Sequence, residues 1–366
     1  MRVSGMALLG LAVASALGCA TAKPKAAVVW PPPPDVARIR FVTAFRQTSD
    51  LDTSTSSQLM RVLLGGDREA MLGRPMGLAL SPDGKRLYIA DSGLLAVFVA
   101  DFEKKTLTEL AGVDSVGTAF GVAVDSDEHI YVADQTGKRV VVLDRHGAVI
   151  RHIGKDAGLV RPSGVALDVA RRLVYVSDPA TLRTPDHRVL VFTFEGELVR
   201  TLGKGRGPEK GQFHFPIFLA VDPEGRLFVG DTMNFRVQVF SPEGNFIRAH
   251  GDNGVGPGSF ARIKGVAFDS FSNLYVVEGE YAVVQMFNRE FQALMYFGGT
   301  APKLEYLELP TGIAIDPKTN RIYVANALHP RVNVYELVNT KPEDSLAPAP
   351  APAPAAAAAP APAPSK

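Results

Sequence analysis

Histidine is the residue type in this 366-residue chain that could most readily support catalysis or metal binding. No two of the seven histidines have the spacing of four residues by which a helix presents a pair of zinc ligands. They also occupy unlike positions when the repeated units described below are aligned, so no zinc triad is visible. We therefore predict solvated or capping histidines, no catalytic residue, and no metal or other cofactor. The histidines lie at positions 129, 146, 152, 187, 214, 250 and 329.

Arginines recur at one position of the repeat, three residues before an equivalent glycine. This recurrence would bring several cations to one face of the fold, beside large apolar side chains. Such a mixture suits an acidic protein segment or an anionic glycan. The alternative is that these arginines pair with loop carboxylates or lie in solvent. The candidate binding residues are Arg74, Phe120, Arg161, Arg183, His214, Phe215, Arg262 and Lys264.

Acidic residues recur at the end of the second strand-like segment of five units. A ring of carboxylates could bind a cation. However, a short carboxylate at a strand end also accepts hydrogen bonds from turn amides and can pair with a following arginine. We predict this structural role for all five. The acids are Asp91, Asp134, Asp178, Asp231 and Glu278, and the following arginines are Arg139, Arg188 and Arg236.

The elements that must position these side chains form an internal repeat. A segment such as Gly121-Val-Ala-Val-Asp125 recurs six times at intervals of 44, 43, 54, 47 and 47 residues. Each is followed by a second strand-like segment, such as Tyr131 to Asp134, then by a third and, in most units, a fourth, with turn-forming sequences between them. Four antiparallel strands at this period predict an all-β fold, a six-bladed β-propeller. Phe218 replaces the glycine of the fourth unit, and we expect it to narrow or distort the channel.

The repeated motifs resemble NHL repeats over about residues 75 to 337. The motifs are Gly-Val-Ala-Val-Asp, Tyr-Val-Ala-Asp, Asn-Phe-Arg-Val-Gln-Val-Phe and Gly211-Gln212-Phe213. The resemblance implies a six-bladed propeller but leaves the activity open, because NHL propellers include protein-binding, RNA-binding and catalytic members. Amidating-lyase relatives hold zinc through three histidines. Six-bladed lactonases hold calcium through acidic and Asn ligands, and their Glu-Gly-Pro motif is replaced here by Arg74-Pro75-Met76.

The sixth unit supplies only three strands, ending near Leu337, so another segment must complete its sheet. Residues Arg38 to Phe45 alternate like a strand, and we predict that they join the sixth blade and close the ring. Residues Ser56 to Leu64 are expected to form a short helix. The predicted domains are 1–18 (signal peptide), 19–37 (lipidated Pro-rich linker), 38–338 (monomeric six-bladed propeller) and 339–366 (disordered Pro/Ala tail).

The N-terminal region resembles the export signal of a bacterial lipoprotein. An apolar run from Gly5 to Gly18 is shorter than the ~20 residues of a membrane-spanning helix. It ends at Cys19, the only cysteine, which is the predicted lipidation site. Leu17 stands one place later than the leucine of a typical processing site, and an ordinary secretory signal is the alternative. Ala20 rather than Asp follows the cysteine, which favours the outer membrane.

Four consecutive prolines, Pro31 to Pro34, lie behind this anchor. Polyproline extends by ~3.1 Å per residue, so the segment from Cys19 to Arg38 is predicted to span up to ~60 Å as a stiff spacer. Trp30 would rest on the membrane interface or on the folded body, or be a linker aromatic.

The formal charge is only +1, from 39 Lys and Arg against 38 Asp and Glu. No global field therefore attracts nucleic acid, and we expect no nucleic-acid partner. The sequence predicts a non-catalytic, lipid-anchored protein of the bacterial cell envelope that binds an envelope protein or an anionic glycan. The alternative is a channel-mouth metal-dependent lyase or lactonase-type hydrolase.

Overall fold

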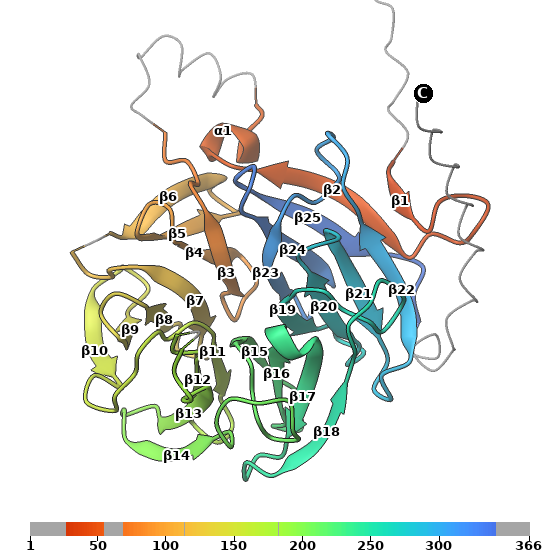
Figure 1. Ribbon diagram of the computed structural model, residues 1–366. Helices are drawn as coiled ribbons and strands as arrows, with labels where there is room; N and C mark the ends of the chain where they lie inside the picture. Colours follow the sequence, from red (N-terminus) through yellow and green to blue (C-terminus); the bar gives the residue numbers. More distant parts are fainter. Residues whose placement is uncertain (1–26, 55–68, 113, 182, 342–366) are drawn as a thin grey trace, which may run out of the picture.

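Six β-sheets surround a central axis in the computed structural model, which describes residues 27–54, 69–112, 114–181 and 183–341 (Figure 1). The predicted all-β, six-bladed propeller is confirmed. The predicted signal peptide, Cys19, the helix expected at residues 56–64 and most of the Pro/Ala tail lie outside the described residues. Within the described ranges, no helix is long and apolar enough to cross a bilayer.

Blades one to five each contain four antiparallel strands in chain order. Blade one contains β3 (Pro75–Leu80), β4 (Arg86–Asp91), β5 (Ala96–Asp101) and β6 (Thr106–Ala111), and blade two contains β7 (Ala119–Val124), β8 (Ile130–Asp134), β9 (Arg139–Leu143) and β10 (Val149–Ile153). Blade three contains β11 (Val165–Asp168), β12 (Leu173–Asp178), β13 (Arg188–Thr193) and β14 (Leu198–Leu202), and blade four contains β15 (Pro216–Val221), β16 (Leu227–Asp231), β17 (Arg236–Phe240) and β18 (Phe246–His250). Blade five contains β19 (Ile263–Phe268), β20 (Leu274–Glu278), β21 (Val283–Phe287) and β22 (Ala293–Gly298). The third strands of blades two, three and four begin at the predicted arginines.

The hydrophobic core lies between neighbouring blades. Tyr88 and Ala90 of blade one, for example, pack with Val122 and Val132 of blade two. Successive residues of a strand point to opposite sides of its sheet, so the second strand of a blade contacts the neighbouring blade on each side. This explains why the second strands, such as β8, are buried along their whole length.

The inner strands meet at the axis, backbone against backbone. A Cβ atom on Gly121 would lie 2.3 Å from the carbonyl oxygen of Ser163 in blade three, and one on Gly312 would lie 2.1 Å from that of Met76 in blade one. Glycine is therefore required for this close approach. The axial cavity between the inner strands measures only about 40 Å³, and Phe218 is among its lining residues. This is room for about three water molecules at most.

The predicted ring closure is confirmed. Blade six contains β23 (Pro310–Ile315), β24 (Arg321–Asn326) and β25 (Arg331–Leu337), and its sheet continues through β2 (Ile39–Phe45) to β1 (Val29–Trp30). β2 pairs antiparallel with β25 from Ile39–Leu337 to Phe45–Val332, with one irregularity between Phe41 and Thr43. Ile39 and Phe45 are buried, so the closing strand contributes apolar side chains as well as hydrogen bonds.

The segment before β2 differs from the predicted spacer. Val29 and Trp30 form β1, and the amide of Arg38 donates to the carbonyl of Trp30 at 2.7 Å, so the chain folds back across the prolines instead of extending. The Trp30 ring lies on the body, 5.7 Å from Tyr335 and 6.2 Å from Phe297. Aromatic packing has therefore overridden the extended preference of the proline run.

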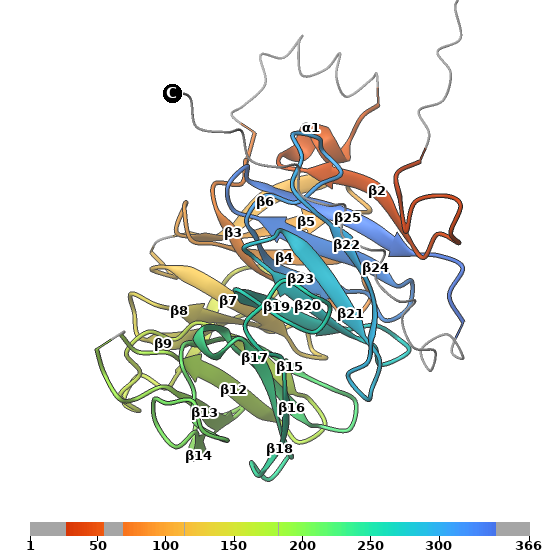
Figure 2. The same ribbon diagram turned by 45° about the vertical axis from the view of Figure 1, so that its right-hand side comes forward.

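A single helical turn, α1 (Thr48–Leu51), leads from the closing strand to blade one. The Thr48 hydroxyl bonds both the carbonyl and the amide of Leu107, each at 3.0 Å. Figures 1 and 2 both place α1 between β2 and β6. The N-terminal segment thus connects the outer edges of blades six and one.

Candidate functional site

The five recurring acids hold the chain where it enters the inner strand of each blade. Asp91 accepts hydrogen bonds from the amides of Gly73 and Arg74 at 2.8 Å, and Asp178 accepts one from Arg161 at 2.8 Å. Glu278 likewise bonds the amide of Arg262. All five acids are almost fully buried. The predicted structural role is therefore correct, and the acids also position the backbone of the candidate binding arginines.

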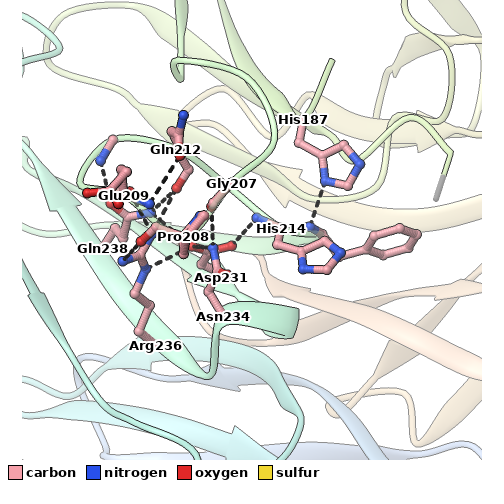
Figure 3. A network of polar contacts seen from close by, with 12 residues as sticks. His187, Gly207, Pro208, Glu209, Gln212, His214, Asp231, Asn234, Arg236 and Gln238 are labelled. Carbon is pink, nitrogen blue, oxygen red and sulfur yellow. Dashed lines mark hydrogen bonds and ion pairs between the residues drawn. The ribbon is translucent and has the colours of Figure 1, made fainter. Parts of the chain in front are cut away.

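Blade four shows the fullest set of these contacts (Figure 3). Asp231 accepts from the amide of His214 at 2.6 Å and from the side chains of Asn234 (2.8 Å), Gln238 (2.9 Å) and Arg236 (3.0 Å). Burial raises the pKa of Asp231, while these donors oppose that shift. The carboxylate is thus fully occupied by protein donors and has a framework role.

Four predicted binding residues gather at the channel mouth, on the face where the inner strands begin. Lys264 lies directly before Gly265 on the inner strand β19, with its side chain half-buried. Burial, together with the positive charges of Arg262, Arg74 and Arg161, lowers the pKa of Lys264 to about 8. The convergence of these cations from blades one, three and five is what the repeat predicts. We call Lys264 with these three arginines the cationic mouth.

Few carboxylates compensate the cationic mouth. Arg262 pairs with Glu280 at 3.3 Å, and both side chains are about half-exposed, so this pair is weak. Arg74 and Arg161 are exposed, and neither has a carboxylate partner in the part of the chain that the structure describes. The nearby Glu278 raises the pKa of Lys264, but its oxygens already accept backbone amides. The mouth therefore has a net positive potential that an anion can neutralise.

Apolar side chains border the cationic mouth. Phe120, a half-buried residue of β7, lies 5.9 Å from Phe218 between ring centroids. Phe215 lies under the guanidinium of Arg161, 6.0 Å from its ring centre. The structure thus places the predicted aromatic residues next to the predicted cations.

A second part of the site is built by an insertion in blade three. Arg188 comes ten positions after Asp178, whereas in the other blades the corresponding residue comes five positions later. His187 fixes this insertion: its Nε2 lies 3.2 Å from the carbonyl oxygen of Thr181, and its Nδ1 accepts from the amide of Phe215 at 2.9 Å (Figure 3). One histidine therefore joins the insertion of blade three to the entry loop of blade four.

Two cavities lie between this insertion and blade four. The first, of about 540 Å³, is lined by Arg183, Arg206, His214 and Asn234 among others, and we call it the cationic cavity. The second, of about 530 Å³, is lined mainly by Val160, Arg161, Ala180, Phe215 and Met233, and we call it the apolar cavity. Of two consecutive residues, His214 lines the cationic cavity and Phe215 lines the apolar cavity.

Both histidines at these cavities are held neutral near pH 7. Burial lowers the pKa of His187, and the Arg206 charge lowers it further. Burial and Arg206 also lower the pKa of His214, against the opposing charge of Asp231. The Nε2 atom of His214 is buried without a hydrogen-bond partner. A nitrogen buried without a hydrogen bond lowers the stability of the folded protein, so its presence here requires an explanation.

The remaining histidines lie apart from this site. His129 binds Asp125 at 3.0 Å, and His329 binds Glu308 at 2.6 Å. His250 packs against Phe287 and Phe291. Within the described ranges, no group of three or more His, Cys, Asp or Glu residues has the arrangement of a metal site.

Two family models match parts of the chain. A model of the SMP-30/gluconolactonase/LRE-like region matches residues 41–177, and a model of a 6-bladed β-propeller matches residues 219–287. The first match begins within the closing strand β2 and runs through blades one and two into the second strand of blade three. The second covers most of blade four and three strands of blade five.

Curated relatives match at modest identity. NHL repeat-containing protein 3 of Homo sapiens is 26% identical over 184 residues, which are 48% of this chain and 53% of that protein. The peptidyl-glycine alpha-amidating monooxygenase of Mus musculus is 24% identical over 247 residues, which are 63% of this chain and 24% of that protein. The chain thus spans about half the length of the first relative and about a quarter of the second.

Solved structures share the fold. A protein of unknown function from Bacteroides thetaiotaomicron superposes with a TM-score of 0.54 at 16% identity, covering 72% of this chain and 70% of that one. Virginiamycin B lyase from Staphylococcus aureus superposes with a TM-score of 0.53 at 15% identity, covering 75% and 86%. At these identities the likeness concerns the fold alone.

The sheet topology defines a six-bladed β-propeller, and the motifs and these matches make it similar to NHL-repeat proteins and to the SMP-30/gluconolactonase/LRE-like region. Propellers of this type differ widely in activity, so the function must be argued from the site and not from the fold.

The sequence did not single out every residue of the site. His187 ties the insertion to blade four, and Met233 and Asn234 line the apolar and the cationic cavity, but the sequence assigned none of the three to a binding site. The longer interval of 54 residues before the fourth unit was the one available signal, because it marks the insertion that builds the cavity walls.

Proposed function

We propose that this chain is a non-catalytic binding protein of the bacterial cell envelope that recognises an acidic protein segment at the cationic mouth. The observation that carries the proposal is the convergence of Arg74, Arg161 and Arg262 around a half-buried Lys264. Four cations close together repel one another, so binding of an anionic group relieves their repulsion and is favourable.

The closed axis also supports recognition on the face of the propeller. The axial cavity of about 40 Å³ excludes a side chain or sugar from the interior of the ring. Phe120 and Phe215 offer apolar surface beside the cations. Apolar contact with a partly aromatic wall favours a protein segment, whose side chains combine both characters, over a uniformly polar glycan.

Titration with a hexaglutamate peptide tests this function. We expect binding that weakens with added salt, and a loss of at least about tenfold when Arg74, Arg161 and Arg262 are all replaced by Glu. Polygalacturonate serves as the anionic-glycan probe, and tighter binding of that polymer would replace the protein segment by a glycan. Unchanged hexaglutamate affinity and salt dependence in a correctly folded triple variant would contradict the proposal.

The envelope location is proposed from the N-terminal sequence. Cys19 is the acyl acceptor in this proposal, and acylation would hold the propeller at a membrane, which we expect to be the outer one. Cys19→Ala should release the protein into the soluble fraction and remove the mass of the lipid. A mature protein with an unacylated N-terminus elsewhere would contradict the anchor.

The enzyme alternative is supported by the match of residues 41–177 to the SMP-30/gluconolactonase/LRE-like region. A lactonase-type hydrolase or a lyase in this class would hold its metal at the channel mouth. Elemental analysis of the purified protein distinguishes the two functions. Zinc or calcium at one ion per chain, lost on replacement of a single mouth residue, would favour the enzyme.

A further inference from the structure

We propose that the two cavities between blades three and four form one binding site for an organic carboxylate joined to an apolar group. The carboxylate would lie in the cationic cavity and the apolar group in the apolar cavity. This inference rests on the proposed binding function of this face, and adds to it a separate site with its own ligand chemistry.

The insertion of blade three forms walls of both cavities. Ala180 lines the apolar cavity, while Arg183 and Pro185 line the cationic cavity. In repeat proteins, an insertion confined to one unit commonly lies on the binding face. Loop length alone would not produce a defined site, so the way in which the insertion is held is decisive.

Hydrogen bonds hold the insertion against blade four without any ligand. His187 is fully buried and bonds Thr181 within the insertion and the amide of Phe215 opposite. The amide of Arg206 donates to the carbonyl of Pro185 at 2.8 Å, which ties the two loops at a second point. A preformed site binds more tightly, because little conformational entropy is lost when the ligand arrives.

The cationic cavity has the chemistry of a carboxylate site. Arg183 is exposed, and among the described residues its side chain has no carboxylate partner. Arg206 adds a second positive charge, which is strong enough to lower the pKa of His214. Asp231, the acid whose charge acts on His214, is engaged by Arg236 and Asn234. Arginine recognises a carboxylate through two parallel hydrogen bonds, so Arg183 is the expected main contact.

The apolar cavity has a different lining. Val160, Ala180 and Phe215 are apolar, and Met233 on the short helix η1 (Thr232–Asn234) is 43% exposed. Arg161 is the one cation of this lining, and its guanidinium lies over the Phe215 ring. Methionine adapts to differently shaped apolar groups. A volume of about 530 Å³ is enough for an aromatic ring or a branched aliphatic group. Consecutive residues line different cavities, His214 the cationic one and Phe215 the apolar one, and on this closeness in the chain we base a single ligand that carries both groups.

Titration of the full propeller with 3-phenylpropanoate, followed by ligand-observed NMR, tests the site. The neutral 3-phenylpropanamide and acetate each lack one half of the proposed ligand, and we expect both to bind at least about tenfold more weakly. Arg183→Ala should weaken 3-phenylpropanoate binding about tenfold, and Met233→Ala should weaken it severalfold. Arg145→Ala, a change in an exposed turn of blade two, is the matched control and should leave binding unchanged.

A peptide ending in Gly-Gly-Phe with a free carboxylate identifies the source of the ligand. Binding of this peptide, but not of its amidated form, would assign the site to a protein C-terminus, whereas binding of the small acid alone would assign it to a free carboxylic acid. Equal binding of 3-phenylpropanoate and its amide, or equal effects of Arg183→Ala and Arg145→Ala, would overturn the inference. Arg74→Glu with Arg262→Glu leaves both cavity linings intact, so unchanged hexaglutamate binding in this variant would contradict only the cationic mouth and would leave the two-cavity site standing.

Discussion

Blade six and the pair of blades three and four are built from the same repeat, yet their polar groups differ in how far they are satisfied. In blade six the closing strand adds hydrogen bonds, and Trp30 covers the outer aromatic residues. In blades three and four an insertion leaves two cavities, the exposed Arg183 and an unsatisfied nitrogen on His214. The repeated residues therefore account for stability, while the insertion that departs from the repeat provides the candidate binding residues.

Ile39→Asp should have the largest effect, because it places an unpaired carboxylate in the closed edge of blade six. Ile39 is fully buried against Leu337, its partner in the sheet. We expect a loss of about 3–5 kcal/mol in the free energy of unfolding, measured by urea denaturation. Val42→Asp is the matched control on the same strand, where the side chain is exposed, and should cost about 1 kcal/mol or less. Similar losses from both variants would contradict the role of Ile39 in closure.

Asp231→Ala tests whether buried hydrogen bonds stabilise blade four as the closing strand stabilises blade six. The change removes the acceptor of four donors and leaves the buried Arg236 charge unpaired. We expect a loss of about 3 kcal/mol in the free energy of unfolding. Glu243→Ala in an exposed turn of the same blade is the control. A loss below about 1 kcal/mol would show that Asp231 is not a structural acid.

Lys264→Met should change stability in the opposite direction. Because the pKa of Lys264 falls from 10.5 to about 8 on folding, its charge destabilises the native state at pH 7. The wild-type protein should gain stability as pH rises from about 8 towards 10.5, and the variant should lack this gain. At pH 7 we expect the variant to be more stable by about 1–3 kcal/mol. Lower thermal stability of the variant would contradict the assignment of Lys264 to a binding role.

The pH dependence of hexaglutamate binding should give the smallest effect. Lys264 carries its charge below a pH of about 8 and loses it above. Affinity should therefore fall severalfold as pH rises from 7 to 9.5, since one of four cations is lost. Lys264→Met should remove this dependence and retain the binding due to the arginines. An identical pH profile in both proteins would exclude Lys264 from the site.

Much of the framework followed from periodic residues. The glycine positions, the second-strand acids and the third-strand arginines recur, so their shared roles could be inferred before any coordinates. The closing strand was also predictable, because the sixth unit lacked one. Each of these predictions rests on residues that recur at equivalent positions of the units, and equivalent positions have the same local structure in each unit of a repeat.

The parts that could not be predicted depend on contacts between non-equivalent positions. Nothing in the sequence pairs His187 with the amide of Phe215, because a backbone amide has no sequence signature. The folding back of Trp30 over Tyr335 overrode the extended preference of the prolines through aromatic packing. The volume of the axial cavity depended on how closely the six inner strands approach, five of them at a glycine and one at Phe218, which periodicity does not give.

The two ends of the described chain leave the ring side by side. The amide of Val338 donates to the carbonyl of Arg38 at 2.8 Å, and the Asn339 side chain donates to the carbonyl of Ala37 at 3.1 Å. A fusion partner or an immobilising surface attached at either end would therefore pull on the same edge. In a ring of six blades, the outer edge of blade six lies on the side away from blades three and four. The protein can be mounted from blade six, by either end, with both cavities directed outwards.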